Sequence, residues 1–249
     1  MSSSSVEVGA AAVWWLGQGS FVFEGPHSGP VVVDPYLSNS AGAKRLFPVP
    51  VAPSDLKVSA IFLTHDHIDH TDPETLVDLV RANPEASIYA SPASVAHLAR
   101  IGITGATVDT LLRDDIVMIP GASVHAVYAK HTEDSVGLVF TFDNGPTIYH
   151  TADTEYFEGI EATARFHPDL LTICINGRWG NMTIDEAVKV TAGIAPTEVL
   201  PMHWGMFAEN TADPQEFLAK LAQANLPTKP VFLEATGLSR HVVHKTHRE

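Results

Sequence analysis

Apolar residues in the first third of the chain occur in short runs broken by glycine, proline and aspartate. These runs predict four strands, at residues 12–17, 20–25, 29–34 and 58–64. The last run is typical of a buried strand and leads directly into a polar stretch. Two helices are expected next, because Asp72 and Ser91 each precede a proline, and a capping residue before proline is typical of a helix start.

In the rest of the chain, strand-like runs come first and then alternate with helical patterns. Further strands are predicted at residues 115–119, 123–129, 136–142, 147–153, 170–176, 198–204 and 229–235. Helices are predicted at residues 155–166, 183–194 and 213–225. This order favours an α/β protein in which two sheets pack together with helices outside.

The polar stretch after the fourth strand concentrates residues that bind metals. Its pattern is His-x-His-x-Asp-His, formed by His65, His67, Asp69 and His70. Alternation by two places His65 and His67 on one side of an extended segment, and Asp69 and His70 follow in the turn before the helix. One metal ion could take the first pair and a second ion the last pair. Imidazole together with carboxylate suits Zn, Mn or Fe rather than Ca.

Four side chains cannot complete two coordination spheres, so the site needs ligands from elsewhere. Three candidates follow the ends of predicted strands: His131, Asp153 and His203. In layered α/β folds, functional groups gather where strands end and loops begin. We therefore expect these three side chains to meet the motif.

Composition narrows the class of partner and the compartment. The 249-residue chain carries a net charge of −14 without a basic run, which argues against nucleic acid and is compatible with a small-molecule substrate. A single cysteine, Cys174, indicates a reducing compartment. No secretory signal and no long apolar run is visible, so a cytoplasmic protein without membrane contact is expected. The sequence is compatible with a homo-oligomer.

Taken together, the motif and the three later candidates resemble the metallo-β-lactamase superfamily. That resemblance implies one αββα sandwich over residues 1–249, with two mixed β-sheets flanked by helices. It implies two divalent metal ions, Zn or Mn, that share Asp153. The first ion would take His65, His67, His131 and Asp153, and the second Asp69, His70, Asp153 and His203. Asp34 matches an aspartate that braces the motif loop in the family.

Three longer stretches are similar to the subgroup that includes L-ascorbate-6-phosphate lactonase. They read WWLGQGSFVFE, INGRWGNMTIDEA and PMHWGMFAENTADPQEF, at residues 14–24, 175–187 and 201–217. The subgroup enzymes are longer, with an N-terminal extension and insertions, and their counterpart of residues 15–20 reads differently. The subgroup resemblance therefore carries over the reaction class rather than the substrate itself.

The expected function is hydrolysis by a water that the metal ions activate. Asp69 or Asp153 would accept the proton of that water. A lactone of a sugar or sugar phosphate is the expected substrate, and a small phosphodiester on the same dinuclear site is the alternative. Candidate substrate contacts are Asn176, Arg178 and Trp204.

Arg178 could clamp a phosphate or carboxylate, or it could brace its loop or face solvent. Lys44 and Arg45 form a second candidate anion patch, and exposed basic pairs of this kind are usually only solvated. His150, three residues before Asp153, is the remaining histidine of interest, and the sequence leaves its role open.

Overall fold

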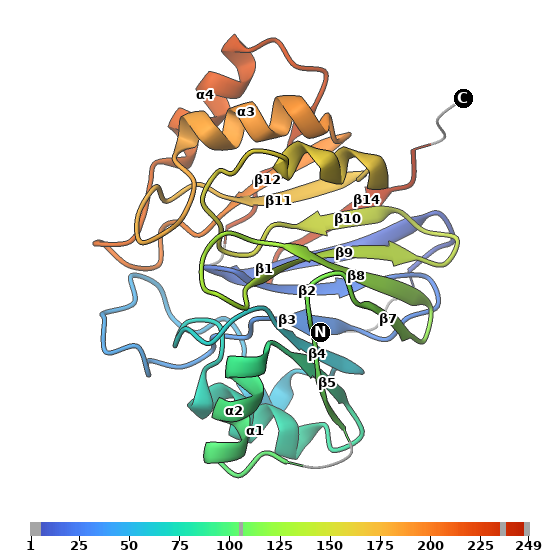
Figure 1. Cartoon of the computed structure of the whole chain (residues 1–249), viewed down its shortest axis with the longest axis vertical. Coiled ribbons are helices and arrows are strands. Elements are labelled where there is room, and N and C mark those ends of the chain that lie inside the picture. Colours follow the sequence, from blue (N-terminus) through green and yellow to red (C-terminus); the bar gives the residue numbers. More distant parts are fainter. Residues whose placement is uncertain (1–5, 105–106, 235–237, 247–249) are drawn as a thin grey trace.

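In the computed structural model, which describes residues 6–104, 107–234 and 238–246, two seven-stranded sheets face each other (Figure 1). The first sheet has the order β14 (Arg240–His244), β1 (Ala10–Gly17), β2 (Ser20–Glu24), β3 (Val31–Val33), β4 (Ala60–Leu63), β5 (Ser87–Ala90) and β6 (Val108–Thr110). The second has the order β13 (Lys229–Pro230), β12 (Glu198–Met202), β11 (Leu170–Cys174), β10 (Thr147–His150), β9 (Val136–Phe142), β8 (Ala122–Tyr128) and β7 (Ile116–Ile119).

Helices cover the outer faces of both sheets. Figure 1 shows α1 (Pro73–Ala82) and α2 (Pro92–Arg100) at one end of the molecule, and α3 (Ile184–Ile194) and α4 (Pro214–Gln223) at the other. Two 3-10 helices complete the elements, η1 (Pro53–Asp55) and η2 (Ile160–Phe166). The predicted αββα sandwich is thereby confirmed. None of these helices has the length and apolar content needed to cross a bilayer.

Strand β1 shows why a sandwich forms from this sequence. Alternate side chains of a strand point to opposite faces. Val13 and Trp15 join the apolar core between the sheets, whereas Trp14 and Leu16 join the core beneath α1 and α2. Because both faces are buried, the strand is apolar at every position from Ala10 to Leu16.

The helix starts follow the predicted chemistry. Asp72 caps α1 by accepting a hydrogen bond from the backbone N–H of Glu74, and Pro73 occupies the first turn. Thr183 and Glu186 form the expected capping box at α3. These caps satisfy N–H groups that an α-helix leaves unpaired, and they fix where the preceding loops end.

Several elements differ from the sequence-based expectation. The helix predicted at 155–166 is a 3-10 helix over Ile160–Phe166, and it is shorter because Gly159 and His167, both with positive φ, bound it at either end. The strand predicted at 229–235 is paired only at Lys229–Pro230, and residue 235 lies outside the described residues. Strands β5, β6 and β14 were not expected from the sequence. They are short, and β6 and β14 lie at the sheet edges with polar, partly exposed residues.

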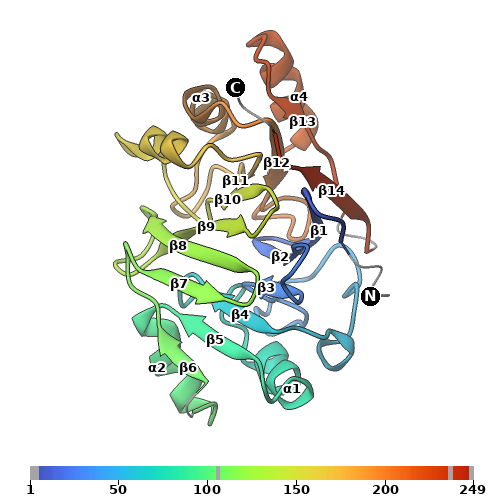
Figure 2. The same cartoon turned by 90° about the vertical axis from the view of Figure 1, so that its right-hand side faces the viewer.

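The last strand of the chain, β14, lies at one edge of the first sheet and pairs with the first strand, β1. Figure 2 shows β14 next to β1, and the two pair antiparallel from Ala10–His244 to Trp14–Arg240. The two strands come from opposite ends of the described chain. Local patterning cannot reveal such a long-range pairing, which explains why β14 escaped prediction.

His150 lies in the core between the sheets and gives a test of this packing. Its Nδ1 lies 2.8 Å from Thr172 Oγ1, and its ring meets Phe21 and Phe23 edge-on. Burial lowers the pKa of this imidazole to about 4. The imidazole of His150 therefore binds a proton near pH 6.5 in the unfolded chain but only near pH 4 in the folded protein. The contribution of His150 to the free energy of unfolding is fully present above pH 6.5 and is lost as the pH falls towards 4.

We predict that the free energy of unfolding of the wild type falls by about 2 kcal/mol more between pH 7 and pH 5 than that of His150→Gln. Urea denaturation at the two pH values measures the difference. His27→Gln, at an exposed position, is the matched control and should follow the wild type. Equal acid sensitivity of wild type and His150→Gln would contradict the burial of a neutral imidazole.

Candidate metal centre

Strand directions bring six chain segments to one edge of the sandwich. Strands β1 and β3 both run antiparallel to β2, and β4 runs parallel to β3. In the other sheet β8 and β10 both run antiparallel to β9, and β12 runs in the direction of β10. The segments that follow the ends of these six strands carry Gln18, Asp34, the motif at 65–70, His131, Asp153 and His203.

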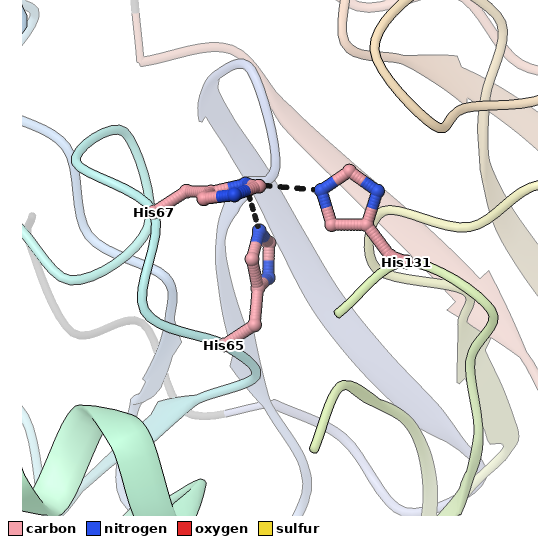
Figure 3. A group of neighbouring side chains, drawn as sticks. All are labelled: His65, His67 and His131. Atoms are coloured by element: carbon pink, nitrogen blue, oxygen red, sulfur yellow. Dashed lines mark hydrogen bonds between the residues drawn. The ribbon is translucent and has the colours of Figure 1, made fainter. Parts of the chain in front are cut away.

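Three imidazoles converge on one point at this edge. His67 Nδ1 lies 3.0 Å from His65 Nε2 and 3.0 Å from His131 Nε2, as Figure 3 shows. A neutral imidazole has one N–H and one lone pair, so three ring nitrogens that face each other cannot all be satisfied by one another. A divalent cation accepts all three lone pairs at once. This face of the site fits a metal ion.

A second group of possible ligands lies beside the first and consists of Asp69, His70 and His203. His203 Nε2 lies 3.6 Å from one oxygen of Asp69, and His70 Nε2 lies 3.9 Å from the other. His70 is fully buried, and its Nε2 has no hydrogen-bond partner among the described residues. A buried nitrogen without a partner is costly unless a cation or proton donor meets its lone pair.

Asp153 stands between the two groups. Its Oδ2 lies 3.1 Å from His203 Nε2, 3.4 Å from His70 Nε2 and 3.7 Å from His131 Nε2. Only 4 % of the residue is exposed, and its Oδ1 has no hydrogen-bond partner among the described residues. One carboxylate can therefore reach ions on both sides. We refer to His65, His67, Asp69, His70, His131, Asp153 and His203 as the seven-residue cluster.

Charge is distributed unevenly within the cluster. Burial would raise the pKa of Asp153, but His203 and His70 outweigh burial and hold that pKa well below its usual value. Burial alone would lower the pKa of His70, yet the carboxylates around it, Asp153 first, raise it well above 6.5. Burial lowers the pKa of His65 far below 6.5, and His70 adds to the effect. His65 is thus neutral, the form that binds metals.

Asp34 orients the cluster from behind. The residue is fully buried, and its Oδ1 accepts a hydrogen bond of 2.8 Å from the backbone N–H of Thr64. Its Oδ2 accepts from Thr64 Oγ1 at 2.6 Å and from His70 Nδ1 at 2.8 Å. With its Nδ1 proton held by a carboxylate, the His70 ring turns its other nitrogen towards the site. Asp34 also lies near His65, but its oxygens are already engaged in this brace.

Other ligand candidates are held in the same way. His131 Nδ1 donates to the backbone oxygen of Gly180 at 2.9 Å, which leaves Nε2 for the site. Asn181 Nδ2 donates to Asp153 Oδ2 at 2.9 Å. Both contacts come from one loop after β11, so this loop positions ligand candidates from two other strands.

Two glycines permit the close approach of backbone to these rings. A Cβ atom on Gly19 would lie 2.7 Å from His70 Cε1. A Cβ atom on Gly180 would lie 2.8 Å from His131 Nδ1, and the φ of +84° at this residue is itself unfavourable for other residues. Larger side chains at either position would push an imidazole out of the cluster.

Backbone strain also collects at this edge. Gln18, Asp34, Ala152 and His203 have φ values of 49°, 45°, 54° and 63°. Non-glycine residues rarely adopt this left-handed conformation, and it persists only where the surroundings enforce it. Such residues gather where the six segments meet, which indicates that the surrounding structure holds this site in a fixed shape.

A pocket of about 390 Å³ opens over the cluster. Its floor contains His67, Asp69, His131, Asp153 and His203, and its walls are Ala41, Ala43, Ile68, Trp179, Asn181, Phe207, Glu209 and Asn210. The volume lies within the range of small-molecule sites. The cluster is therefore reachable from solvent by a small ligand.

Comparisons with known proteins agree with this geometry. A family model described as the beta-lactamase superfamily domain matches residues 30–204. A UPF0173 metal-dependent hydrolase of Thermoplasma acidophilum is 31 % identical over 212 residues, which cover 82 % of this chain and 88 % of the relative.

The chain belongs to the beta-lactamase superfamily. Within the superfamily it is a member of the UPF0173 family of metal-dependent hydrolases. A second relative, from Thermodesulfovibrio yellowstonii, is 27 % identical in an alignment of 246 residues that covers 89 % of this chain and 88 % of the relative.

Solved structures share the superfamily fold. A metallo hydrolase from the archaeon Ignicoccus hospitalis superposes with a TM-score of 0.80 at 20 % identity, covering 95 % of this chain and all of that one. An isothiocyanate hydrolase from Delia radicum gut bacteria superposes with a TM-score of 0.75 at 17 % identity, covering 94 % and 100 %. At these identities the likeness shows the metallo-β-lactamase fold. The narrower resemblance to the ascorbate-phosphate lactonase subgroup stays a prediction.

The structure brings all seven sequence-predicted ligands of this superfamily site together, but not the three predicted substrate contacts. Asn176 donates to Asn210 Oδ1 at 2.7 Å and supports its loop. Arg178 is exposed and does not line the pocket. Trp204 donates to the backbone oxygen of Pro201 and packs against Trp15.

The second candidate anion patch is also absent from the pocket. Lys44 is exposed, and the buried guanidinium of Arg45 donates to the backbone oxygens of Tyr36 and Ser38 at 3.2 and 3.1 Å. Arg45 thus holds together the loop after β3. These hydrogen bonds to the backbone give Arg45 a structural role.

Sequence reasoning missed Gln18 as a member of the site. Its Nε2 lies 3.2 Å from Asp69 Oδ2 and within 3.5 Å of both ring nitrogens of His203, and its backbone oxygen accepts from the N–H of His203. The available signal was its place in the tight turn Gly17–Gly19 between two buried strands.

Asp66 of the motif faces the other way and pairs with His97 and Arg100 of α2 at 2.6 and 3.5 Å.

We predict that Asp34→Asn weakens metal binding about 10- to 100-fold, because the amide has one acceptor oxygen in place of two and cannot accept all three hydrogen bonds from Thr64 and His70. Competition with a chromophoric chelator measures the affinity. Asp78→Asn, which changes an exposed carboxylate of α1, is the matched control. Unchanged affinity in a folded Asp34→Asn protein would refute the orienting role.

Proposed function

We propose that this metal-dependent hydrolase opens a lactone or a closely related small ester, using two divalent ions, Zn or Mn, at the seven-residue cluster. The observation that carries the proposal is the position of Asp69 and Asp153. Both carboxylates belong to the cluster and both line the pocket. A substrate in the pocket would therefore contact the residues that hold the metal ions.

The donor set supports two ions rather than one. Five imidazoles and two carboxylates surround the site, and Asp153 is within reach of both groups. When bound, divalent ions would lower the pKa of water towards neutrality and polarise the carbonyl oxygen of the substrate. Imidazole-rich sites of this composition suit Zn and Mn rather than Ca.

The two carboxylates differ in how they are held, and this difference divides their roles. Asp153 is buried and tied by Asn181 and the neighbouring histidines, so it serves to hold the ions. The side chain of Asp69 is 16 % exposed and is steadied by one amide contact from Gln18. Asp69 is thus the better proton acceptor for a water that enters from the pocket.

The reaction needs no protein nucleophile. The water oxygen bonds to the carbonyl carbon, the ring C–O bond breaks, and the departing alkoxide takes a proton, which yields a hydroxy acid. None of the described residues that line the pocket is a serine, threonine, cysteine or lysine. Cys174 is buried and does not line the pocket, and burial raises the pKa of its thiol to about 12.

A phosphodiester is the alternative substrate on the same site. Phosphoryl transfer usually relies on arginine or lysine to balance the charge of the non-bridging oxygens. Because none of the described lysines or arginines lines the pocket, a carbonyl substrate is the better match.

We predict that His67→Ala lowers kcat/KM for lactones by at least about 10³-fold, since one face of the site loses a ligand. Chelation of the metal should have the same effect on the wild type, and added Zn or Mn should restore only the wild type. His67 is exposed, so the substitution leaves the core intact. His27→Ala, also exposed, is the control.

A substrate panel separates the two reactions. Sugar lactones and alkyl lactones are compared with p-nitrophenyl phosphodiesters, each with Zn and with Mn. Hydrolysis of lactones alone is the expected result. Faster turnover of the phosphodiesters would replace the lactonase proposal, and full activity in His67→Ala would overturn the role of the cluster.

A further inference from the structure

We infer that the pocket selects an uncharged lactone that carries an apolar substituent, and that it discriminates against phosphorylated or carboxylated lactones. The reaction part of this inference rests on the proposed function. The binding part rests on the pocket walls alone and can be measured without turnover.

Five of the eight wall residues of the pocket are apolar, and these five come from four separate loops. Ala41 and Ala43 follow β3, Ile68 lies within the motif, Trp179 follows β11 and Phe207 follows β12. Trp179 is 67 % exposed and is held with a φ of 51°. Trp179 and Ile68 are both exposed and line the same pocket, and exposed apolar side chains that gather around one pocket are typical of ligand-binding grooves.

The wall formed by Phe207 is preorganised by packing within the protein. Phe207 packs against Tyr36 and Met206 in a separate apolar cluster, with Ala41 and Ala43 at its edge. The backbone N–H of Leu46 donates to the backbone oxygen of Met206 at 2.9 Å, which joins the two loops. A preformed apolar wall binds an apolar group without an ordering cost.

Charge on the pocket walls opposes an anionic substituent. None of the lysines and arginines in residues 6–104, 107–234 and 238–246 lines the pocket, whereas the exposed carboxylate of Glu209 does. The whole chain carries a net charge of −14, which repels anions at longer range. A phosphate that reached these walls would meet a carboxylate and no guanidinium.

Neutral polar groups in the walls suit the uncharged part of a substrate. Asn181 and Asn210 line the pocket and are nearly buried. Asn181 Oδ1 has no hydrogen-bond partner among the described residues, and Asn210 Oδ1 accepts from Asn176. Amides of this kind can pair with a hydroxyl or a ring oxygen, and they place no charge against it.

The volume limits the size of the substrate. A cavity of about 390 Å³ lies near the lower end of the range of small-molecule sites. A δ-lactone ring with a chain of a few carbons matches this space. An aliphatic chain then lies against Trp179 and Ile68, with the carbonyl towards the floor.

The test measures kcat/KM of the metal-loaded full-length protein for three δ-lactones: an unsubstituted lactone, a pentyl-substituted lactone and a phosphorylated sugar lactone. The pentyl lactone should exceed the other two in kcat/KM by about tenfold or more. Trp179→Ala should raise KM for the pentyl lactone about tenfold and raise KM for the unsubstituted lactone much less. Met118→Ala, which removes an exposed apolar side chain far from the pocket, should change nothing.

A charge variant gives the converse result. Glu209→Lys should raise kcat/KM for the phosphorylated lactone severalfold, because a cation then faces the phosphate. Preference of the wild type for the phosphorylated lactone would overturn the inference, as would a Trp179→Ala effect of equal size on all three substrates.

Calorimetric binding of lactams separates failure of this inference from failure of the proposed function. The pentyl lactam resists hydrolysis and should bind the metal-loaded protein at least about tenfold more tightly than a carboxylated lactam, with the difference reduced in Trp179→Ala. If no lactone is hydrolysed but this binding order holds, the proposed reaction is wrong and the apolar selectivity stands. If both lactams bind equally, the selectivity is wrong.

Discussion

The buried carboxylate of Asp34 is the interaction on which the rest of the site depends. It joins the end of β3 to the motif loop through Thr64, and it fixes the ring of His70 through Nδ1. A buried carboxylate is costly unless every oxygen is paired, so the three hydrogen bonds leave the loop one stable position. The motif supplies ligands, and Asp34 determines where they point.

The same edge of the sandwich combines strain with close packing. Gln18 and His203 adopt left-handed backbone conformations, and Gly19 lets the chain approach His70 more closely than a Cβ would permit. The two sheets provide the stability that such strain consumes, through a continuous apolar core between them. The packing of the two layers thus offsets the backbone strain of the loops, where six strand ends converge.

Much of this site could be predicted from the sequence, because its ligands obey simple local rules. His65 and His67 alternate in one extended segment, and His131, Asp153 and His203 follow strand ends. The predicted substrate residues were less accessible to such rules. The loop after β11 turns through Gly177, Trp179 and Gly180 with positive φ, so Arg178 faces solvent and its neighbour enters the pocket. Spacing in sequence does not encode these directions.

The arrangement separates reactivity from selectivity. Four of the seven residues that would hold metal ions, His65, His70, Asp153 and His203, are buried, and Asp34 and Asn181 hydrogen-bond to His70 and Asp153, so small changes there should weaken metal binding. The side chains of Trp179 and Ile68 are exposed and make no hydrogen bonds with the described residues, so they can change without disturbing the fold. Relatives that share the cluster can therefore differ in substrate, and the residues that decide the substrate are found on the loops rather than in the motif.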